Sequence, residues 1–204
     1  MKNDKTLSFS RRNLPHWFVT DAAYFVTIRL KGSIPKNVAE EIQSEITEMK
    51  KTIENPDDII DLERLHFNKM EAILDSCKDS PIWLGNEEVA RLIRESADWL
   101  AGRGWRYFGV VMPNHLHLLM VNKEGRSAEL SKDLGQFKNF TAKEANRILQ
   151  RKGSFWLPEN FDHWCRNQGK VESVKRYILN NPVKAGLVDS TEDWPYYFSG
   201  EPES

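Results

Sequence analysis

The sequence predicts an α+β domain: a ferredoxin-like antiparallel sheet with helices on one face, an inserted helical hairpin and a C-terminal helix. Two observations predict this class. When a segment at about residues 36–80 is set aside, the expected elements run strand, helix, strand, strand, helix, strand, helix. The two middle strands are joined by a Pro-Asn turn, which is typical of antiparallel neighbours. We therefore expect residues 1–204 to form one domain with a helical insertion.

The first half of the chain supplies one strand and three helices. Residues 23–31 are rich in β-branched and aromatic side chains and predict a strand that ends at Gly32. Residues 37–53 and 59–78 are charged and amphipathic, with Asn55-Pro56-Asp57 between them, and predict the helical hairpin. A third helix is expected over 87–101, where Asn86 can cap its first turn.

The second half of the chain completes the sheet. The expected elements are two strands, a long basic helix beginning at Ser127, a fourth strand and a last helix that stops at Pro182: residues 105–112, 115–121, 127–151, 161–166 and 172–181. The tail from Asp189 is polar with aromatic residues, and we expect it to pack across the surface.

Composition indicates an ordinary globular protein. The chain is 40% hydrophobic and 29% charged, and it holds no apolar run long enough for a membrane helix. Its N-terminus lacks the apolar core of a signal peptide, and Cys77 and Cys165 lie far apart without metal-ligand spacing. We expect free thiols, a cytoplasmic location and no membrane partner.

Charge is distributed unevenly, although the net charge is only −1. Residues 37–99 carry 16 acidic and 7 basic side chains, whereas residues 126–185 carry 12 basic and 6 acidic ones. The net charge is therefore −9 for residues 37–99 and +6 for residues 126–185. A basic half raises the local concentration of a polyanion, although solvation of helix faces explains the same charges.

The pattern His115-Leu116-His117 lies inside an apolar run that begins at Val110 and continues to Val121. On a strand, side chains two residues apart share a face, so both imidazoles point the same way. Two co-facing imidazoles are half of a divalent-metal site. Histidines held in the core by hydrogen bonds are the competing interpretation.

Tyr177 and Asn181 are four residues apart on the last predicted helix, and therefore lie on one face of it. If that face covers the histidine face of the sheet, two imidazole nitrogens and a carboxamide oxygen meet a phenol. Mixed nitrogen and oxygen ligands favour Mg²⁺ or Mn²⁺. A core tyrosine and a residue at a helix end are the plainer interpretations.

Several segments resemble one family closely. The segment 112–119 is similar to the HUH signature (His, hydrophobic, His) of single-tyrosine transposases, and the segment 177–188 resembles the tyrosine-bearing segment of their REP-associated branch. Shorter similarities to this branch extend the resemblance from about residue 11 to about residue 198. They lie at residues 25–30, 32–33, 153–156 and 161–162.

The resemblance implies a fold, a substrate and an activity. It implies a ferredoxin-like domain that binds single-stranded or hairpin DNA, with a divalent metal held by His115 and His117. Tyr177 would attack a phosphodiester to give a 5′-phosphotyrosine and a free 3′-OH. Asn181 would be the third ligand, with Asp162 and His163 as competing candidates.

Basic side chains mark the expected DNA contacts. They follow the long helix, flank the tyrosine, precede the last helix and stand in the N-terminal arm: Lys138, Lys143, Arg147, Lys175, Arg176, Arg166, Arg11 and Arg12.

The first hypothesis for the function is a metal-dependent DNA nickase and strand transferase. Two other functions compete with it. One is a domesticated hairpin-binding protein with little catalytic activity, and the other is a metal-dependent small-molecule hydrolase. The sequence is compatible with both a monomer and a homodimer.

Overall fold

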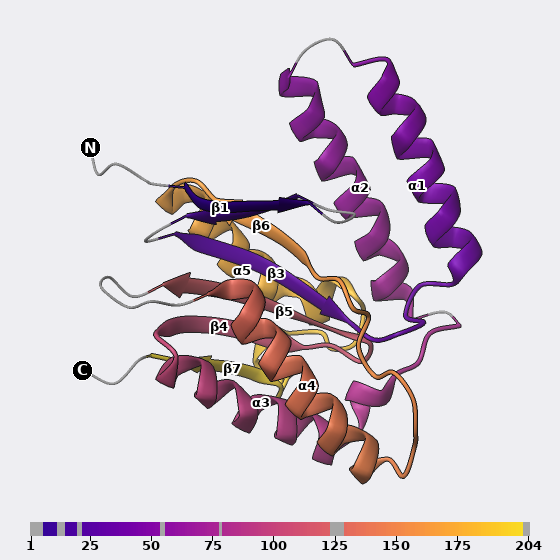
Figure 1. Cartoon of the computed structure of the whole chain (residues 1–204). Helices are drawn as coiled ribbons and strands as arrows, with labels where there is room; N and C mark the ends of the chain where they lie inside the picture. The colour runs from indigo at the N-terminus through magenta and orange to yellow at the C-terminus, as the bar shows by residue number, and fades with distance from the viewer. Residues whose placement is uncertain are drawn as a thin grey trace.

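The computed structural model describes residues 6–11, 15–19, 22–53, 56–77, 79–122 and 129–201 (Figure 1). Its centre is a five-stranded antiparallel sheet in the order β6-β3-β5-β4-β7. The strands are β3 (Ala23–Arg29), β4 (Trp105–Val111), β5 (His115–Asn122), β6 (Phe161–Cys165) and β7 (Tyr197–Gly200). Without the edge strand β7, the order is that of a ferredoxin-like βαββαβ unit, as predicted.

The two faces of the sheet carry different helices. On one face, α3 (Glu87–Gly102) and α4 (Leu130–Ile148) pack on alternate strand residues such as Val26 and Leu118. On the other face lies α5 (Gln168–Lys184), whose Val174 and Ile178 contact a second cluster. Figure 1 shows α3 and α4 in front of the sheet and α5 behind it.

The predicted insertion is a helical hairpin formed by α1 (Lys36–Lys51) and α2 (Pro56–Ser76). Its two helices share a small apolar cluster of their own around Ile42, Ile46 and Leu62. The hairpin stands to the upper right of the sheet, and the lower end of α2 lies beside the end of β3 (Figure 1).

The structure differs from the predictions, or adds to them, in three segments. The last helix does not stop at Pro182 but runs to Lys184, because a proline in the last turn removes only one hydrogen bond of the helix. The tail forms β7, which pairs with β4. The N-terminal arm contains β1 (Thr6–Arg11) and β2 (Pro15–Val19), which form a two-stranded ribbon.

The N-terminal residues predicted to touch DNA lie at the margin of what the structure describes. Arg11 is the last residue of β1 and only its backbone is described, while Arg12 lies outside the described residues. Ser127, where the sequence predicts that the long basic helix begins, also lies outside them, and the first residue of α4 is Leu130. The described helices include none that is long and apolar enough to cross a bilayer.

Candidate metal centre and nucleophile

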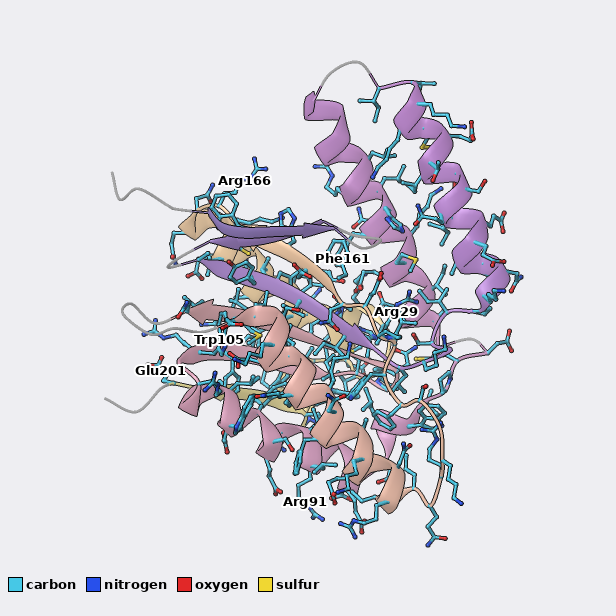
Figure 2. All side chains as sticks on the ribbon, viewed as in Figure 1. Arg29, Arg91, Trp105, Phe161, Arg166 and Glu201 are labelled. Carbon is cyan, nitrogen blue, oxygen red and sulfur yellow. The ribbon has the colours of Figure 1, made fainter. Side chains whose placement is uncertain are left out.

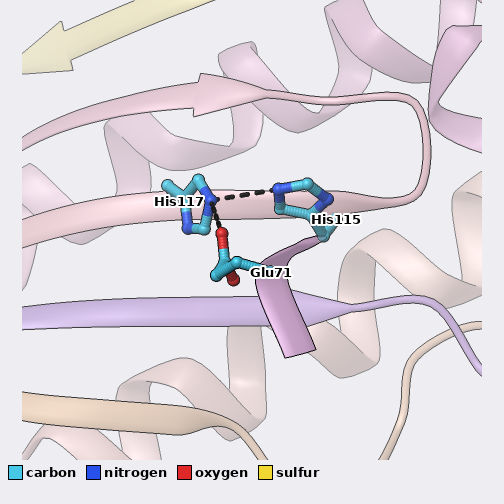
Figure 3. A group of neighbouring side chains, drawn as sticks. All are labelled: Glu71, His115 and His117. Atoms are coloured by element: carbon cyan, nitrogen blue, oxygen red, sulfur yellow. Dashed lines mark hydrogen bonds and ion pairs between the residues drawn. The ribbon is translucent and has the colours of Figure 1, made fainter. Parts of the chain in front are cut away.

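The two histidines of β5 face α5, as their spacing predicts. Their Nε2 atoms are 3.0 Å apart, and both side chains are fully buried (Figure 3). Burial, followed by the proximity of His117, lowers the pKa of His115 to about 3. His115 is therefore neutral near pH 7, and its unprotonated nitrogen is free to bind a cation.

Each ring is oriented by a hydrogen bond to its other nitrogen. The Nδ1 atom of His115 lies 2.6 Å from the side-chain oxygen of Asn114, which can only accept, so Nδ1 carries the proton. The Nδ1 atom of His117 lies 3.0 Å from the hydroxyl of Thr27 on β3. Such contacts to the distal nitrogen fix the ring and turn Nε2 toward the centre, as in known metal sites.

A third donor comes from the insertion, and the sequence analysis missed it. The Glu71 carboxylate on α2 lies 2.9 Å from Nε2 of His117 (Figure 3). Burial alone would raise the pKa of Glu71, but the two histidines outweigh it and lower that pKa to about 2. Glu71 is thus a buried carboxylate, a group that proteins keep only when it is paired or binds a metal.

The predicted nucleophile lies against the same carboxylate. The Tyr177 hydroxyl donates to Oε2 of Glu71 at 2.5 Å, and its ring is 5.4 Å from that of His117. Burial, followed by the negative charge of Glu71, raises the pKa of Tyr177. The phenol is therefore protonated, and a positive charge near Glu71 would favour its ionisation.

Asn181 lies one turn beyond Tyr177 and is fully buried. Its amide influences the pKa of both His115 and Tyr177, so it is close to both. Neither its oxygen nor its nitrogen makes a hydrogen bond of ordinary geometry with the described residues. A buried carboxamide without partners is costly, which fits a group that waits for a ligand.

The spacing of the donors fits a divalent cation. Adjacent ligands of an octahedral ion with bonds of about 2.1 Å lie about 3.0 Å apart. The Nε2 atoms of the histidines are 3.0 Å apart, and Oε2 of Glu71 is 2.9 Å from that of His117. Among the described residues, these three form the one such group of His, Cys, Asp or Glu donors, all within 4.8 Å of one another.

The competing ligand candidates do not join this group. Asp162 pairs with Val26 in the β3–β6 register, which places it on the face of α3 and α4. His163 pairs with Phe25 on the correct face, but it lies two strands away from β5. The structure therefore favours Glu71 over both.

Lys138 does not present its charge to solvent, contrary to the expected DNA contact. Its ammonium group is buried and donates to the carbonyls of Leu157 and Pro158 and to the side chain of Asn160, at 2.7 to 2.8 Å. Burial lowers the pKa of Lys138 to about 8. Its observed role is to hold the loop before β6.

The other basic residues divide between the two faces of the sheet. Lys143 and Arg147 are exposed on α4, on the face opposite the histidines. Lys175 and Arg176 are exposed on α5, which covers the histidine face. Arg166 is exposed just before α5, with its guanidinium over the ring of Trp164.

Fold and site together define a class: a ferredoxin-like α+β domain with a His-hydrophobic-His pair on a central strand, facing a tyrosine on a helix. The chain is similar to REP-associated tyrosine transposases. It is 31% identical to one from Haemophilus influenzae over 94 residues, which are 42% of this chain and 53% of that protein. It is 31% identical to one from Escherichia coli K12 over 87 residues, 43% and 49% of the two chains.

The fold of the whole chain is similar to that of a solved structure, a REP-associated tyrosine transposase bound to a REP hairpin. The TM-score is 0.51 at 19% identity, over 94% of this chain and 82% of the other. No family model matches the chain. The chain spans about half the length of the curated relatives it matches. These comparisons confirm the resemblance found in the sequence and the fold it implied.

Proposed function

We propose that this protein is a metal-dependent DNA nickase and strand transferase that acts on single-stranded or hairpin DNA. One observation carries the proposal: the Tyr177 hydroxyl lies in a buried site with His115, His117 and Glu71. A phenol next to a potential cation site is suited to attack on a phosphodiester. The relatives named above are transposases, which supports the same class of reaction.

The proposed reaction is a transesterification. The Tyr177 oxygen forms a bond to phosphorus, the bond from phosphorus to the 3′ oxygen breaks, and the phenolic proton ends on that leaving oxygen. The products are a 5′-phosphotyrosine and a free 3′-OH. Glu71 holds the hydroxyl before attack, and the ring packs against Phe25 at 5.7 Å, so that the nucleophile is already oriented.

His115, His117 and Glu71 would hold the cation, and the Asn181 carboxamide is the candidate for a fourth position. When bound, Mg²⁺ or Mn²⁺ would polarise the phosphodiester and offset the negative charge that keeps Tyr177 protonated. The chain itself contributes the orientation of the donors through Asn114 and Thr27.

DNA has a plausible path on the same face of the sheet. A groove of about 730 Å³ at the start of α5 is lined by the exposed cations Arg166 and Lys175 and by Arg106. Two of these cations lie over aromatic rings, Arg166 over Trp164 and Lys175 over Phe108, each at 5.9 Å. Cations for phosphates beside aromatic rings for bases are typical of single-strand binding. Figure 2 shows Arg166 at the edge of the sheet next to β6.

Covalent attachment of DNA tests the proposal. The parent protein should form an SDS-stable adduct with a hairpin DNA that carries a single-stranded extension, in the presence of Mn²⁺ or Mg²⁺. The Tyr177→Phe variant should bind the same DNA but form no adduct, because its ring packs without a nucleophilic oxygen. Tyr196→Phe is the matched control and should react like the parent.

Two outcomes would contradict the proposal. An adduct that persists in Tyr177→Phe would show that another group is the nucleophile. Tight binding of the DNA without any adduct in the parent would instead support a hairpin-binding protein that lacks strand transfer.

A further inference from the structure

A cavity of about 720 Å³ lies between the helical hairpin and the sheet. Its lining comes from three places: α1 and α2, the end of β3, and the loop that leads into β6. Glu71 and Thr27 form part of its wall, and these are the residues that touch Tyr177 and His117. The cavity therefore ends at the candidate catalytic site.

Arg29 is the cation that the sheet directs toward this cavity. It is the last residue of β3 and lies directly opposite His115 in the β3–β5 register, on the same face as Thr27. Directly opposed residues of an antiparallel pair have side chains within about 5.5 Å of one another at Cβ. Arg29 is thus a close neighbour of the first histidine.

The guanidinium of Arg29 lacks a partner in the described part of the chain. It makes no hydrogen bond and no ion pair with a described residue, although it is partly buried. Burial, only partly offset by the nearby Glu159, lowers the pKa of Arg29. A half-buried guanidinium that makes no direct ion pair is unfavourable for folding, which is typical of a residue kept for a ligand.

The wall beside Arg29 is held in place by polar contacts. The backbone N–H of Leu157 donates to the carbonyl of Arg29 at 2.8 Å, and Lys138 donates to the carbonyls of Leu157 and Pro158 in the same loop. The rings of Phe67 and Phe161 lie 4.9 Å apart on this wall and offer an apolar surface for a base. Figure 2 shows Arg29 and Phe161 beside the foot of the hairpin.

We propose that Arg29 binds a phosphate of the DNA strand that enters this cavity, next to the phosphate attacked by Tyr177. A guanidinium matches the oxygens of a phosphodiester with two parallel hydrogen bonds. Because the hairpin side of the cavity also carries the Glu40 and Glu48 carboxylates, the phosphate binds on the β3 side, where Arg29 lies. The proposal rests on the proposed function in one respect, namely that the ligand is a DNA strand. Binding of a phosphate by Arg29 does not itself require cleavage.

Binding of a fluorescent hairpin with a single-stranded extension tests this site, measured by anisotropy at several salt concentrations. Arg29→Gln should weaken binding about 10- to 100-fold, the loss expected for charge-assisted hydrogen bonds. It should also lower the log–log salt slope by about 0.7. Glu159→Gln should strengthen binding, because it removes a competing negative charge beside Arg29.

Four controls separate a phosphate site from a structural role. Arg91→Gln removes an exposed arginine of α3 on the other face of the sheet and should leave binding unchanged. A hairpin without the extension should bind parent and Arg29→Gln equally. The melting temperature and the Mn²⁺ affinity of Arg29→Gln should equal those of the parent or exceed them. Inorganic phosphate should compete only weakly if the strand, rather than a free anion, is the ligand.

Equal losses in Arg29→Gln and Arg91→Gln, or a lower melting temperature with an unchanged salt slope, would overturn the proposal. Its failure differs from that of the proposed function. If the parent forms the covalent adduct while Arg29→Gln binds normally, only the phosphate site is wrong. If Arg29→Gln weakens binding but the parent forms no adduct, the phosphate site stands and strand transfer is wrong.

Discussion

The sheet and the helical hairpin both contribute to the candidate site, but they hold their residues in different ways. His115 and His117 lie on a central strand and are fully buried on the face of the sheet that α5 covers. Glu71 comes from a hairpin whose apolar cluster is small and whose surface is acidic. The strand that carries the histidines is held by packing on both faces of the sheet. The hairpin is held against the site by polar contacts and by Phe67, whose ring packs on those of Phe25 and Tyr177.

Two of these polar contacts join the hairpin directly to the tyrosine helix. The first is Glu71 with Tyr177, and the second is Asp75 with Lys184 at 2.7 Å. The Asp75–Lys184 pair is partly exposed and contributes little, so Glu71 and the packing of Phe67 are the contacts that hold the hairpin to the rest of the site. We therefore expect the histidines of the sheet to contribute most of the metal affinity. We expect the hairpin to change that affinity less and to border the path of the DNA strand.

Removal of either histidine should have the largest effect. His115→Ala and His117→Ala should each lower the Mn²⁺ affinity by about 100-fold or more, since outer-shell changes alone cost about 10- to 100-fold. Calorimetric titration with Mn²⁺ measures this loss, and circular dichroism verifies the fold, because the empty space left in the core also lowers stability. Unchanged affinity in both folded variants would mean that these are core histidines and that the sheet holds no metal.

Substitution of Glu71 should have a smaller effect on the metal. Glu71→Gln keeps an oxygen but loses the charge, so the Mn²⁺ affinity should fall about tenfold, within the range for a ligand whose charge is lost. Adduct formation should fall with it. Glu45→Gln is the matched control, because Glu45 belongs to the same hairpin but pairs with Lys69 at its surface.

An increase in adduct formation, instead of a decrease, would change the role of the hairpin. If Glu71→Gln binds Mn²⁺ as the parent does and forms adduct faster, Glu71 shields the site instead of completing it. The hairpin would then be an inhibitory element, and the difference between the two regions would be one of regulation.

The sheet could be predicted from the sequence because its information is local. Alternation along β5 places His115 and His117 on one face, and spacing along α5 places Tyr177 and Asn181 together. The structure brings these faces together as expected. The order of elements then predicted the ferredoxin-like sheet, since short connections and strand pairing leave few alternatives.

The contribution of the hairpin could not be predicted in this way. Glu71 is one of 16 acidic residues between residues 37 and 99, and no local pattern sets it apart. Its role depends on how a whole helix packs against α5, a contact between residues 106 positions apart. The burial of Lys138 could not be predicted from the sequence either. A basic helix predicts exposed lysines, and no local pattern indicates that one of them turns inward.

Substitution of Asn181 should change the Mn²⁺ affinity by a few fold. Asn181→Asp should keep or raise the Mn²⁺ affinity, because a carboxylate of the same size still offers an oxygen to a hard cation. Asn181→Leu should lower the affinity, since leucine has no donor atom. Mn²⁺ titrations of both variants beside the parent measure the difference. Equal affinity in all three would exclude Asn181 as a ligand and leave Glu71 as the sole third donor from the chain.

Substitution of exposed basic residues should have the smallest effect, a change in the salt dependence of DNA binding. Variants on the two faces of the sheet can be compared in this way. Each phosphate neutralised on a single strand adds about 0.7 to the log–log salt slope. If the strand follows the groove at the start of α5, replacing Arg166 and Lys175 with Ala should lower the slope by about 1.4, or twice 0.7. Replacing Lys143 and Arg147 on α4 should leave the slope near that of the parent, because they lie on the other face and Arg147 already pairs with Glu144 at 2.9 Å. Anisotropy titrations with a single-stranded oligonucleotide measure both slopes. A larger decrease for the α4 pair would place the DNA on the face opposite Tyr177 and separate binding from the candidate active site.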